Sequence, residues 1–389
     1  MYDRPAILGG PKAFAEGVAF CKPAVAAWEE VAPELEKMYR SGWLTKGPHL
    51  QAFEKKMSEL LQVKHVVGLG SCTGGLILGL QALGVNKPGG EVIVPSFSFM
   101  ATFHAIWWNN LKPVFVDCEP DTFTVDLAEI EKAINKNTVA IAAVSVFGNA
   151  PDFEGLKALS EKYGLPVFFD SAHGLGTIYK GKPLGGHGAF EVFSLSPTKL
   201  LTGGEGGLLA TDDDAVAAHV RAGRDYGNPG SYDCPSVGLN ARMAEFNAII
   251  ASKSADYLEK YAEHRNKAAQ TYKKGLADLP GLSFQKIREG CRSSYKDFAI
   301  LVGPEFGIER DALSKALIAE GVANRAYFYP AGHKLSCYAY AGEGVKLPVT
   351  ERISDTVVCP PIYSDMDLQT VERICEVFHK LHAYREELK

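Results

Sequence analysis

Closely spaced cysteines are missing from this sequence, although its 389 residues include eight cysteines. No two of them have the CxxC spacing that is the usual signature of a zinc knuckle, so we predict no metal site. A chain of this length also has no need of a disulfide framework to complete its core. The cysteine pattern is therefore typical of a reducing compartment, and we predict a cytoplasmic location.

Long apolar runs are also absent. The longest extends from Val139 to Val144, with a short continuation to Phe147, which is the length of one buried strand. A membrane-spanning helix needs about 20 apolar residues. The first ten residues have neither a basic segment nor a sustained apolar stretch, so they predict no signal peptide. We therefore expect no membrane partner.

Neither sign of charge is in large excess. Lysine and arginine total 41 and aspartate and glutamate total 46, for a net charge of -5. A mildly acidic chain has no general attraction for nucleic acid or anionic lipid, so any phosphate must be held by local groups. Apolar residues make up 46% of the chain, which is ample for a folded core.

Short apolar runs alternate with helix-period segments from about residue 50 to 255. Two helices are predicted, over Asp126–Ile134 and Asp152–Tyr163, each opening with an aspartate suited to the N-cap. This alternation predicts a mostly parallel sheet covered by helices on both faces, with its ligand site at the carboxyl ends of the strands. Four runs are predicted to be buried strands: Glu91–Pro95, Pro113–Asp117, Val139–Val146 and Pro166–Asp170.

The pattern changes near residue 250. A long polar-faced helix is predicted from about Ala251 to Leu276, followed by a strand-like run at Asp297–Val302 and a helix over Arg310–Glu320. We therefore predict a large α/β domain over residues 1–250 and a smaller C-terminal α+β domain over residues 251–389.

A glycine-rich turn, Gly68–Gly75, precedes a helical run at Leu76–Leu83. It is not a dinucleotide fingerprint, because Thr73 occupies the third glycine position. Free backbone N–H groups at the helix start, together with the Ser71 and Thr73 hydroxyls, are suited to holding a phosphate. The same pattern is also typical of an ordinary N-capped helix.

Lys199 ends the tetrapeptide Ser196–Lys199, which spells the S-x-x-K motif of penicillin-recognising enzymes. The S-D-N and K-T-G elements of those enzymes are absent, which argues against that class. The lysine follows a strand-like run at Ala189–Leu195 and precedes the glycine-rich segment Thr202–Gly207. A desolvated lysine in such a site acts as an imine-forming nucleophile, whereas the alternative is a solvated surface lysine.

Asp170 and Phe99 follow two of the predicted strands. Asp170 closes the run Pro166–Asp170, where it is suited either to capping the next segment or to pairing with a buried cation such as a protonated pyridine nitrogen. Phe99 follows Glu91–Pro95 and is either a core residue or a ring that stacks on a planar ligand. Together with the phosphate-ready helix start and the lysine, these are the parts of a pyridoxal 5′-phosphate (PLP) site.

On these residues the sequence resembles the DegT/DnrJ/EryC1/StrS family of PLP-dependent sugar aminotransferases. The resemblance implies a fold-type I PLP-dependent transferase, whose large domain has a mostly parallel central sheet covered by helices and whose smaller C-terminal domain is α+β. The matching segments are Ser41–Pro48, Pro95–Thr102, Val114–Thr122, Asp170–Gly176, Phe193–Gly207, Gly238–Glu245 and Leu347–Arg352.

The resemblance implies four roles around the cofactor ring. Lys199 would form the internal Schiff base with PLP and then carry a proton between the donor Cα and the cofactor C4′. Asp170 would pair with the pyridinium nitrogen, and Phe99 would stack on the ring. His173 stands where many relatives have glutamine, near the 3-hydroxyl of the ring.

The remaining implied roles concern the phosphate, the partner subunit and the sugar. Thr73, Gly74 and Ser194 would bind the phosphate of the cofactor. Asn240 would reach the phosphate bound by the neighbouring subunit, so the resemblance implies a homodimer with shared active sites. His333 aligns with a C-terminal segment near the sugar.

The implied activity is transfer of an amino group from L-glutamate or L-glutamine to a keto group of a nucleotide-activated sugar, in amino-sugar or polysaccharide biosynthesis. Relatives that dehydrate keto-sugars have histidine in place of Lys199, so its presence favours transamination. Ser145 and Phe147 depart from the histidine and tyrosine common in the family, which bears on the substrate. The alternatives are a keto-cyclitol aminotransferase, another PLP lyase or dehydratase of this fold, and a non-enzymatic regulator.

Overall fold

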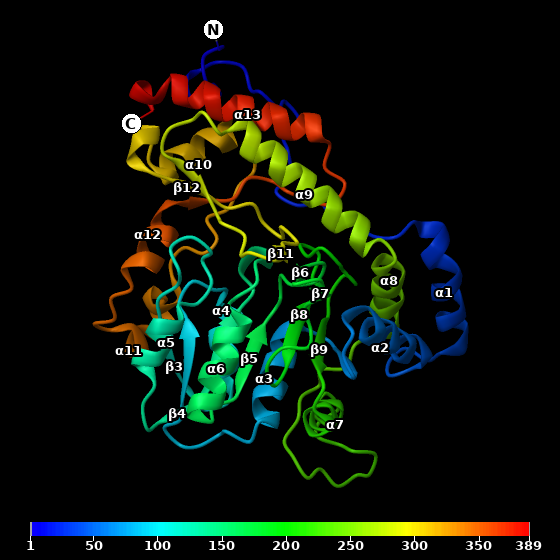
Figure 1. Cartoon of the computed structure of the whole chain (residues 1–389). Helices are drawn as coiled ribbons and strands as arrows, with labels where there is room; N and C mark the ends of the chain where they lie inside the picture. Colours follow the sequence, from blue (N-terminus) through cyan, green and yellow to red (C-terminus); the bar gives the residue numbers. More distant parts are fainter. Residues whose placement is uncertain (1, 389) are drawn as a thin grey trace.

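A seven-stranded sheet forms the centre of the computed structural model, which describes residues 2–388 (Figure 1). Its strand order is β1-β9-β8-β5-β4-β2-β3, and the neighbours from β8 to β3 pair in parallel. Strand β9 is antiparallel to both β8 and β1, so it alone runs in the direction opposite to the other strands. The predicted mostly parallel sheet is therefore confirmed. The strands are β1 (His65–Leu69), β2 (Glu91–Pro95), β3 (Lys112–Val116), β4 (Thr138–Val144), β5 (Val167–Asp170), β8 (Glu191–Ser194) and β9 (Gly207–Thr211).

Helices cover both faces of this sheet (Figure 1). Along β4, Ile141 and Ala143 contact the apolar cluster on one face, and Ala140 and Ala142 contact the cluster on the other. This alternation buries the strand on both sides, which explains its uninterrupted apolar sequence. The first cluster includes residues of α2 (Pro48–Leu61), α5 (Leu127–Ala133), α6 (Phe153–Tyr163) and α8 (Glu245–Ala255), and the second includes residues of α3 (Cys72–Ala82), α4 (Met100–Trp108) and α7 (Asp214–Gly223).

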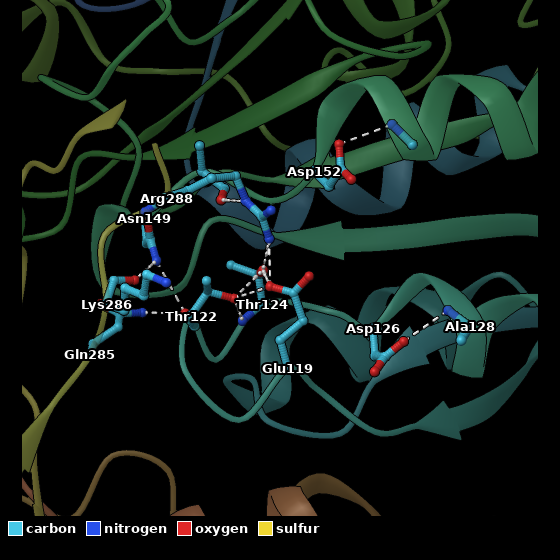
Figure 2. A network of polar contacts seen from close by, with 12 residues as sticks. Glu119, Thr122, Thr124, Asp126, Ala128, Asn149, Asp152, Gln285, Lys286 and Arg288 are labelled. Atoms are coloured by element: carbon cyan, nitrogen blue, oxygen red, sulfur yellow. Dashed lines mark hydrogen bonds and ion pairs between the residues drawn. The ribbon is translucent and has the colours of Figure 1, made fainter. Parts of the chain in front are cut away.

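The two predicted N-caps are confirmed. The carboxylate of Asp126 accepts the backbone N–H of Ala128 at 2.8 Å, and that of Asp152 accepts the N–H of Gly155 at 3.0 Å (Figure 2). Each bond satisfies a donor that the first turn of a helix leaves unpaired.

The chain after the main sheet forms a second, antiparallel sheet, and its helices pack against one another (Figure 1). The strand predicted over Asp297–Val302 begins only at Ile300, whereas the helix predicted from Arg310 is confirmed. Among the helices of residues 2–388, none combines the length and apolarity needed to cross a membrane. The elements are β10 (Leu282–Phe284), β12 (Ile300–Val302), β13 (Val357–Val358), α9 (Leu258–Gly275), α10 (Arg310–Ala319), α12 (Pro348–Thr356) and α13 (Leu368–Ala383).

The long helix predicted from about Ala251 to Leu276 is wrong, because two helices, α8 and α9, occupy this region. The helices separate at Tyr257, whose ψ of 2° departs from helical geometry. Tyr257 Oη donates to Glu30 of α1 (Trp28–Ser41) at 2.6 Å, and this hydrogen bond stabilises the chain at the point where the two helices separate. The chain forms two helices here because of tertiary packing, since α8 packs on the main sheet and α9 packs against α13. Residue 250 lies within α8, and the division into two domains stays a prediction.

Polar contacts fasten the segment after β10 to loops at the carboxyl ends of β3 and β4 (Figure 2). The Arg288 guanidinium forms an ion pair with Glu119, which follows β3. Asn149, which follows β4, donates its side-chain N–H to the Lys286 carbonyl at 2.9 Å. The Gln285 side chain donates to the Thr122 carbonyl at 2.7 Å. These contacts hold the incoming segment at the edge of the sheet where the strands end.

Glu191 on β8 is fully buried and accepts three hydrogen bonds. The backbone N–H groups of Gly185 and His187 donate to it at 2.8 and 2.9 Å, and the Ser171 hydroxyl donates at 2.8 Å. Burial raises the pKa of this carboxyl from 4.5 to about 7.

Glu191→Gln should therefore change how stability depends on pH. Between about pH 4.5 and 7 the folded wild type holds a proton that the unfolded chain has released. Its free energy of unfolding should fall, relative to the glutamine variant, by about 1.4 kcal/mol per pH unit as the pH rises through this window, and then stay level. Urea denaturation of both proteins from pH 5 to 8 measures this difference. Parallel stability curves would show that Glu191 does not titrate in this range.

Candidate active site

A cavity of about 260 Å³ lies at the carboxyl ends of β1, β5 and β8. Its wall includes residues that follow each of these strands, together with residues of the C-terminal third of the chain. Three predicted site residues, Gly74, Asn240 and His333, do not line the cavity. The predicted site residues that line it are Thr73, Phe99, Asp170, His173, Ser194 and Lys199.

Gly207 brings the ends of β1 and β8 together. In the sheet register it pairs with Leu69 of β1 and with Ser194 of β8. A Cβ atom at Gly207 would lie 2.5 Å from the backbone nitrogen of Cys72, so only glycine permits this approach. The glycine-rich segment after Lys199 therefore places the start of α3 beside the end of β8.

The start of α3 offers backbone donors to the cavity. Ser71 is the N-cap, and its hydroxyl accepts the N–H of Gly74 at 3.0 Å. Gly74 is thus engaged inside the turn, whereas the N–H groups of Cys72 and Thr73 have no acceptor among residues 2–388. With the hydroxyls of Thr73 and Ser194 they form a donor set suited to a phosphate.

Asp170 ends β5 and is only 4% exposed. It accepts the Thr102 hydroxyl at 2.6 Å and the backbone N–H of Ala172 at 3.1 Å. Burial raises the pKa of this carboxyl, and Asp170 forms no ion pair within residues 2–388. A buried carboxylate with spare acceptor capacity is suited to a cationic N–H donor from a ligand in the cavity.

Lys199 lies at the cavity wall in a turn closed by its own N–H, which donates to the Ser196 carbonyl at 3.0 Å. Burial, together with the nearby cation of Lys296, lowers the pKa of its ammonium to about 8. A substantial fraction of Lys199 is therefore a neutral amine near pH 8, the form that acts as nucleophile or base.

His173 is held by Phe147, one of the positions that depart from the family pattern. The backbone N–H of Phe147, which has a φ of 57°, donates to His173 Nδ1 at 3.1 Å. The two rings stack with centroids 6.1 Å apart and an interplanar angle of 10°. Burial lowers the pKa of His173 well below its usual range. The imidazole is therefore neutral at pH 7, and its proton resides on Nε2.

Nitrogen NMR of the protein labelled at histidine provides a check on this tautomer. We expect the His173 signals of a neutral ring protonated at Nε2, unchanged between pH 6 and 8, because burial lowers the pKa of this imidazole well below its usual range. A His173→Gln variant assigns the signals. A ring that takes up a second proton above pH 6 would contradict the proposed geometry.

The other predicted site residues are placed differently. Phe99 is the N-cap residue of α4 and is 48% exposed at the cavity edge. Asn240 is exposed and pairs with the backbone of Asp225, away from the cavity wall of its own chain. The ring of His333 is buried, with Nδ1 2.7 Å from the Ser96 hydroxyl and Nε2 3.3 Å from Glu351.

Sequence reasoning missed the wall formed by Lys296, Tyr327 and Phe328. Phe328 stacks near-parallel to His173 with centroids 6.3 Å apart, so this wall confines the imidazole on the side of the C-terminal region. The available signal was the charged pair at Lys296 and Asp297, which stands at the opening of an apolar strand-like run.

Several known proteins are similar to this chain over most of its length. The model of the DegT/DnrJ/EryC1/StrS aminotransferase family matches residues 26–379. The chain is 31% identical to the dTDP-4-amino-4,6-dideoxy-D-glucose transaminase of Escherichia coli, over 92% of this chain and 96% of that one. It is 32% identical to the UDP-N-acetyl-3-dehydro-alpha-D-glucosamine 3-aminotransferase of Acidithiobacillus ferrooxidans, over 91% and 95%. The solved structure of DesI with its TDP-sugar product superimposes with a TM-score of 0.92 at 32% identity, covering 98% of this chain and 97% of that one.

Proposed function

Because the chain belongs to the DegT/DnrJ/EryC1/StrS aminotransferase family, we propose that it moves an amino group from L-glutamate or L-glutamine to a keto group of a nucleotide-activated sugar. The observation that carries this proposal is the presence of Lys199 and Asp170 in one cavity beside the unpaired N–H groups of α3. The curated relatives, named as transaminases of dTDP- and UDP-linked sugars, support this acceptor class.

The residues of the cavity fit PLP, the cofactor expected for the family. When bound, PLP stabilises negative charge on the substrate carbon by withdrawing electrons into its ring. The carboxylate of Asp170 would hold a proton on the pyridine nitrogen, which maintains this electron sink. The N–H groups of Cys72 and Thr73 and the Ser194 hydroxyl would hold the phosphate. His173 would offer its Nε2–H to the 3-hydroxyl.

Lys199 would hold the cofactor and move the proton. Its Nζ would take a proton from Cα of the amino donor and return it at the cofactor C4′. Such transfer is efficient when the pKa of the base lies near the working pH, which the burial of Lys199 provides. Phe99, at the cavity edge, would cover the ring and limit access of water.

A second copy of the chain would complete the site. Asn240 is exposed and lies outside the cavity wall of its own chain, which supports its predicted reach into a neighbouring subunit. We therefore propose a homodimer with shared sites. A position of His333 near the sugar, and a cytoplasmic location, stay predictions.

The test is an amino-transfer assay on the PLP-loaded protein with two donors and two acceptor panels. We expect L-glutamate or L-glutamine to aminate one or more dTDP- or UDP-linked keto-sugars, detected by mass spectrometry. Amination restricted to keto-cyclitols would instead favour the cyclitol aminotransferase. Elimination of water without amino transfer would favour a dehydratase, and a complete lack of turnover would favour a regulator.

A further inference from the structure

Lys296 and Asp297 form a buried ion pair in the cavity wall. The ammonium of Lys296 lies 2.9 Å from both carboxylate oxygens of Asp297, and the two side chains are 4% and 2% exposed. Lys296 lines the same cavity as Lys199. A lysine so enclosed requires a specific set of partners, because desolvation strongly disfavours an incompletely paired charge.

The partners of Lys296 use only part of its capacity. An ammonium has three N–H donors, and the described residues offer hydrogen-bond acceptors for two of them, both on Asp297. The ring of Tyr327 lies 5.1 Å from Nζ and that of Phe20 lies 5.9 Å away. These rings favour a cation through their faces but accept no strong hydrogen bond, so one donor stays available.

A second buried cation lies behind this pair. Arg265 is 2% exposed, and its guanidinium donates to the carbonyls of Tyr295 and Lys296 and to the Ser364 hydroxyl. It forms no ion pair within residues 2–388. Asp297, the carboxylate that most strongly favours the charged form of Arg265, is ion-paired with Lys296, so these three buried side chains carry one excess positive charge.

We propose that Lys296 binds the α-carboxylate of the amino donor. This inference rests on the proposed function and identifies the subsite that selects an α-amino acid. The carboxylate would take the remaining N–H of Lys296 and offset the excess positive charge, as a charge-assisted hydrogen bond in a region sheltered from water.

Two features favour the donor over the acceptor as the occupant. In an α-amino acid the carboxylate is attached to the same carbon as the amino group, so a donor that reaches Lys199 brings its carboxylate into the same small cavity. A nucleoside diphosphate is far larger than a carboxylate and would have to remain at the mouth of a cavity of about 260 Å³, whereas Lys296 is enclosed in its wall.

The test compares the wild type with the double variant Lys296→Gln and Asp297→Asn. In neither protein does residue 296 or residue 297 carry an unpaired buried charge. The apparent dissociation constants for L-glutamate and L-glutamine are measured in single-turnover reactions of the PLP-loaded proteins. Loss of the cation should raise both constants by about 10- to 100-fold, because the two donors share the α-carboxylate. The constant for the keto-sugar acceptor should change by less than about twofold.

Calorimetry with α-methyl-L-glutamate provides a readout that does not depend on turnover. This compound has both carboxylates but no proton on Cα, and it should bind the double variant more weakly by the same factor. Equal binding to the wild type and to the double variant would overturn the inference. So would an effect on L-glutamate without one on L-glutamine, since Lys296 would then contact the side-chain carboxylate. If the wild type transferred no amino group, the proposed function would fail, and calorimetry would still decide whether Lys296 binds the carboxylate.

Discussion

Lys199→Ala should lower the rate of amino transfer by about 10⁴-fold. Alanine can neither hold the cofactor covalently nor move a proton at Cα, and the cavity wall has only one other lysine, Lys296, which is engaged with Asp297. Single-turnover kinetics with L-glutamate measure the loss directly, since they report the donor half of the reaction alone.

Lys157→Ala is the matched control for this variant. Lys157 lies on α6 with its side chain 76% exposed, so its removal should leave the rate within about twofold of the wild type. Circular dichroism and the unfolding midpoint confirm that both variants are folded. A Lys199→Ala protein that kept a tenth or more of the wild-type rate would contradict the role of Lys199.

Asp170→Asn should have the second largest effect, a loss of about 10²- to 10³-fold in the donor half-reaction. Asparagine is similar in size and still offers an oxygen to the N–H of Ala172, but it lacks the negative charge that would keep a proton on the ring nitrogen. The reaction would then lose most of its electron sink. Single-turnover rates of the variant and wild type measure the effect.

A cofactor methylated at the ring nitrogen separates the charge effect from a structural one. Its positive charge does not depend on a proton, so it should restore part of the lost rate to Asp170→Asn. Thr102→Val is the structural control, because it removes the 2.6 Å hydrogen bond to Asp170 and keeps the carboxylate. A larger loss in Thr102→Val than in Asp170→Asn would contradict the charge-based role.

Local sequence patterns predicted the strands and caps that position the site, because each depends on a few neighbouring residues. The run Glu91–Pro95 is buried on both faces and reads as a strand without reference to the rest of the chain. Asp126 and Asp152 cap helices through bonds within one turn. Such features follow from local geometry, and so does the position of Asp170 at a strand end.

Local sequence patterns did not predict the features of the site and fold that depend on tertiary packing. Periodicity alone could not locate the break at Tyr257, since it depends on two helices packing in different layers. The backbone N–H of Gly74 donates to the Ser71 hydroxyl and is therefore not free for a phosphate. The glycine-rich sequence pattern does not reveal this hydrogen bond. Lys296 lines the cavity from a part of the chain that follows β10, and Figure 2 shows the contacts that fasten the beginning of this part to loops at the strand ends.

The absorbance spectrum of the purified protein tests PLP-dependent amino transfer most directly. After PLP is supplied, we expect a band at about 400–430 nm that moves to about 330 nm with L-glutamate and returns when a suitable nucleotide-linked keto-sugar is added. The return requires the acceptor half of the reaction, so one titration follows both halves. A protein that shows no such band after PLP is supplied, or a band that L-glutamate and L-glutamine leave unchanged, would contradict the proposed function.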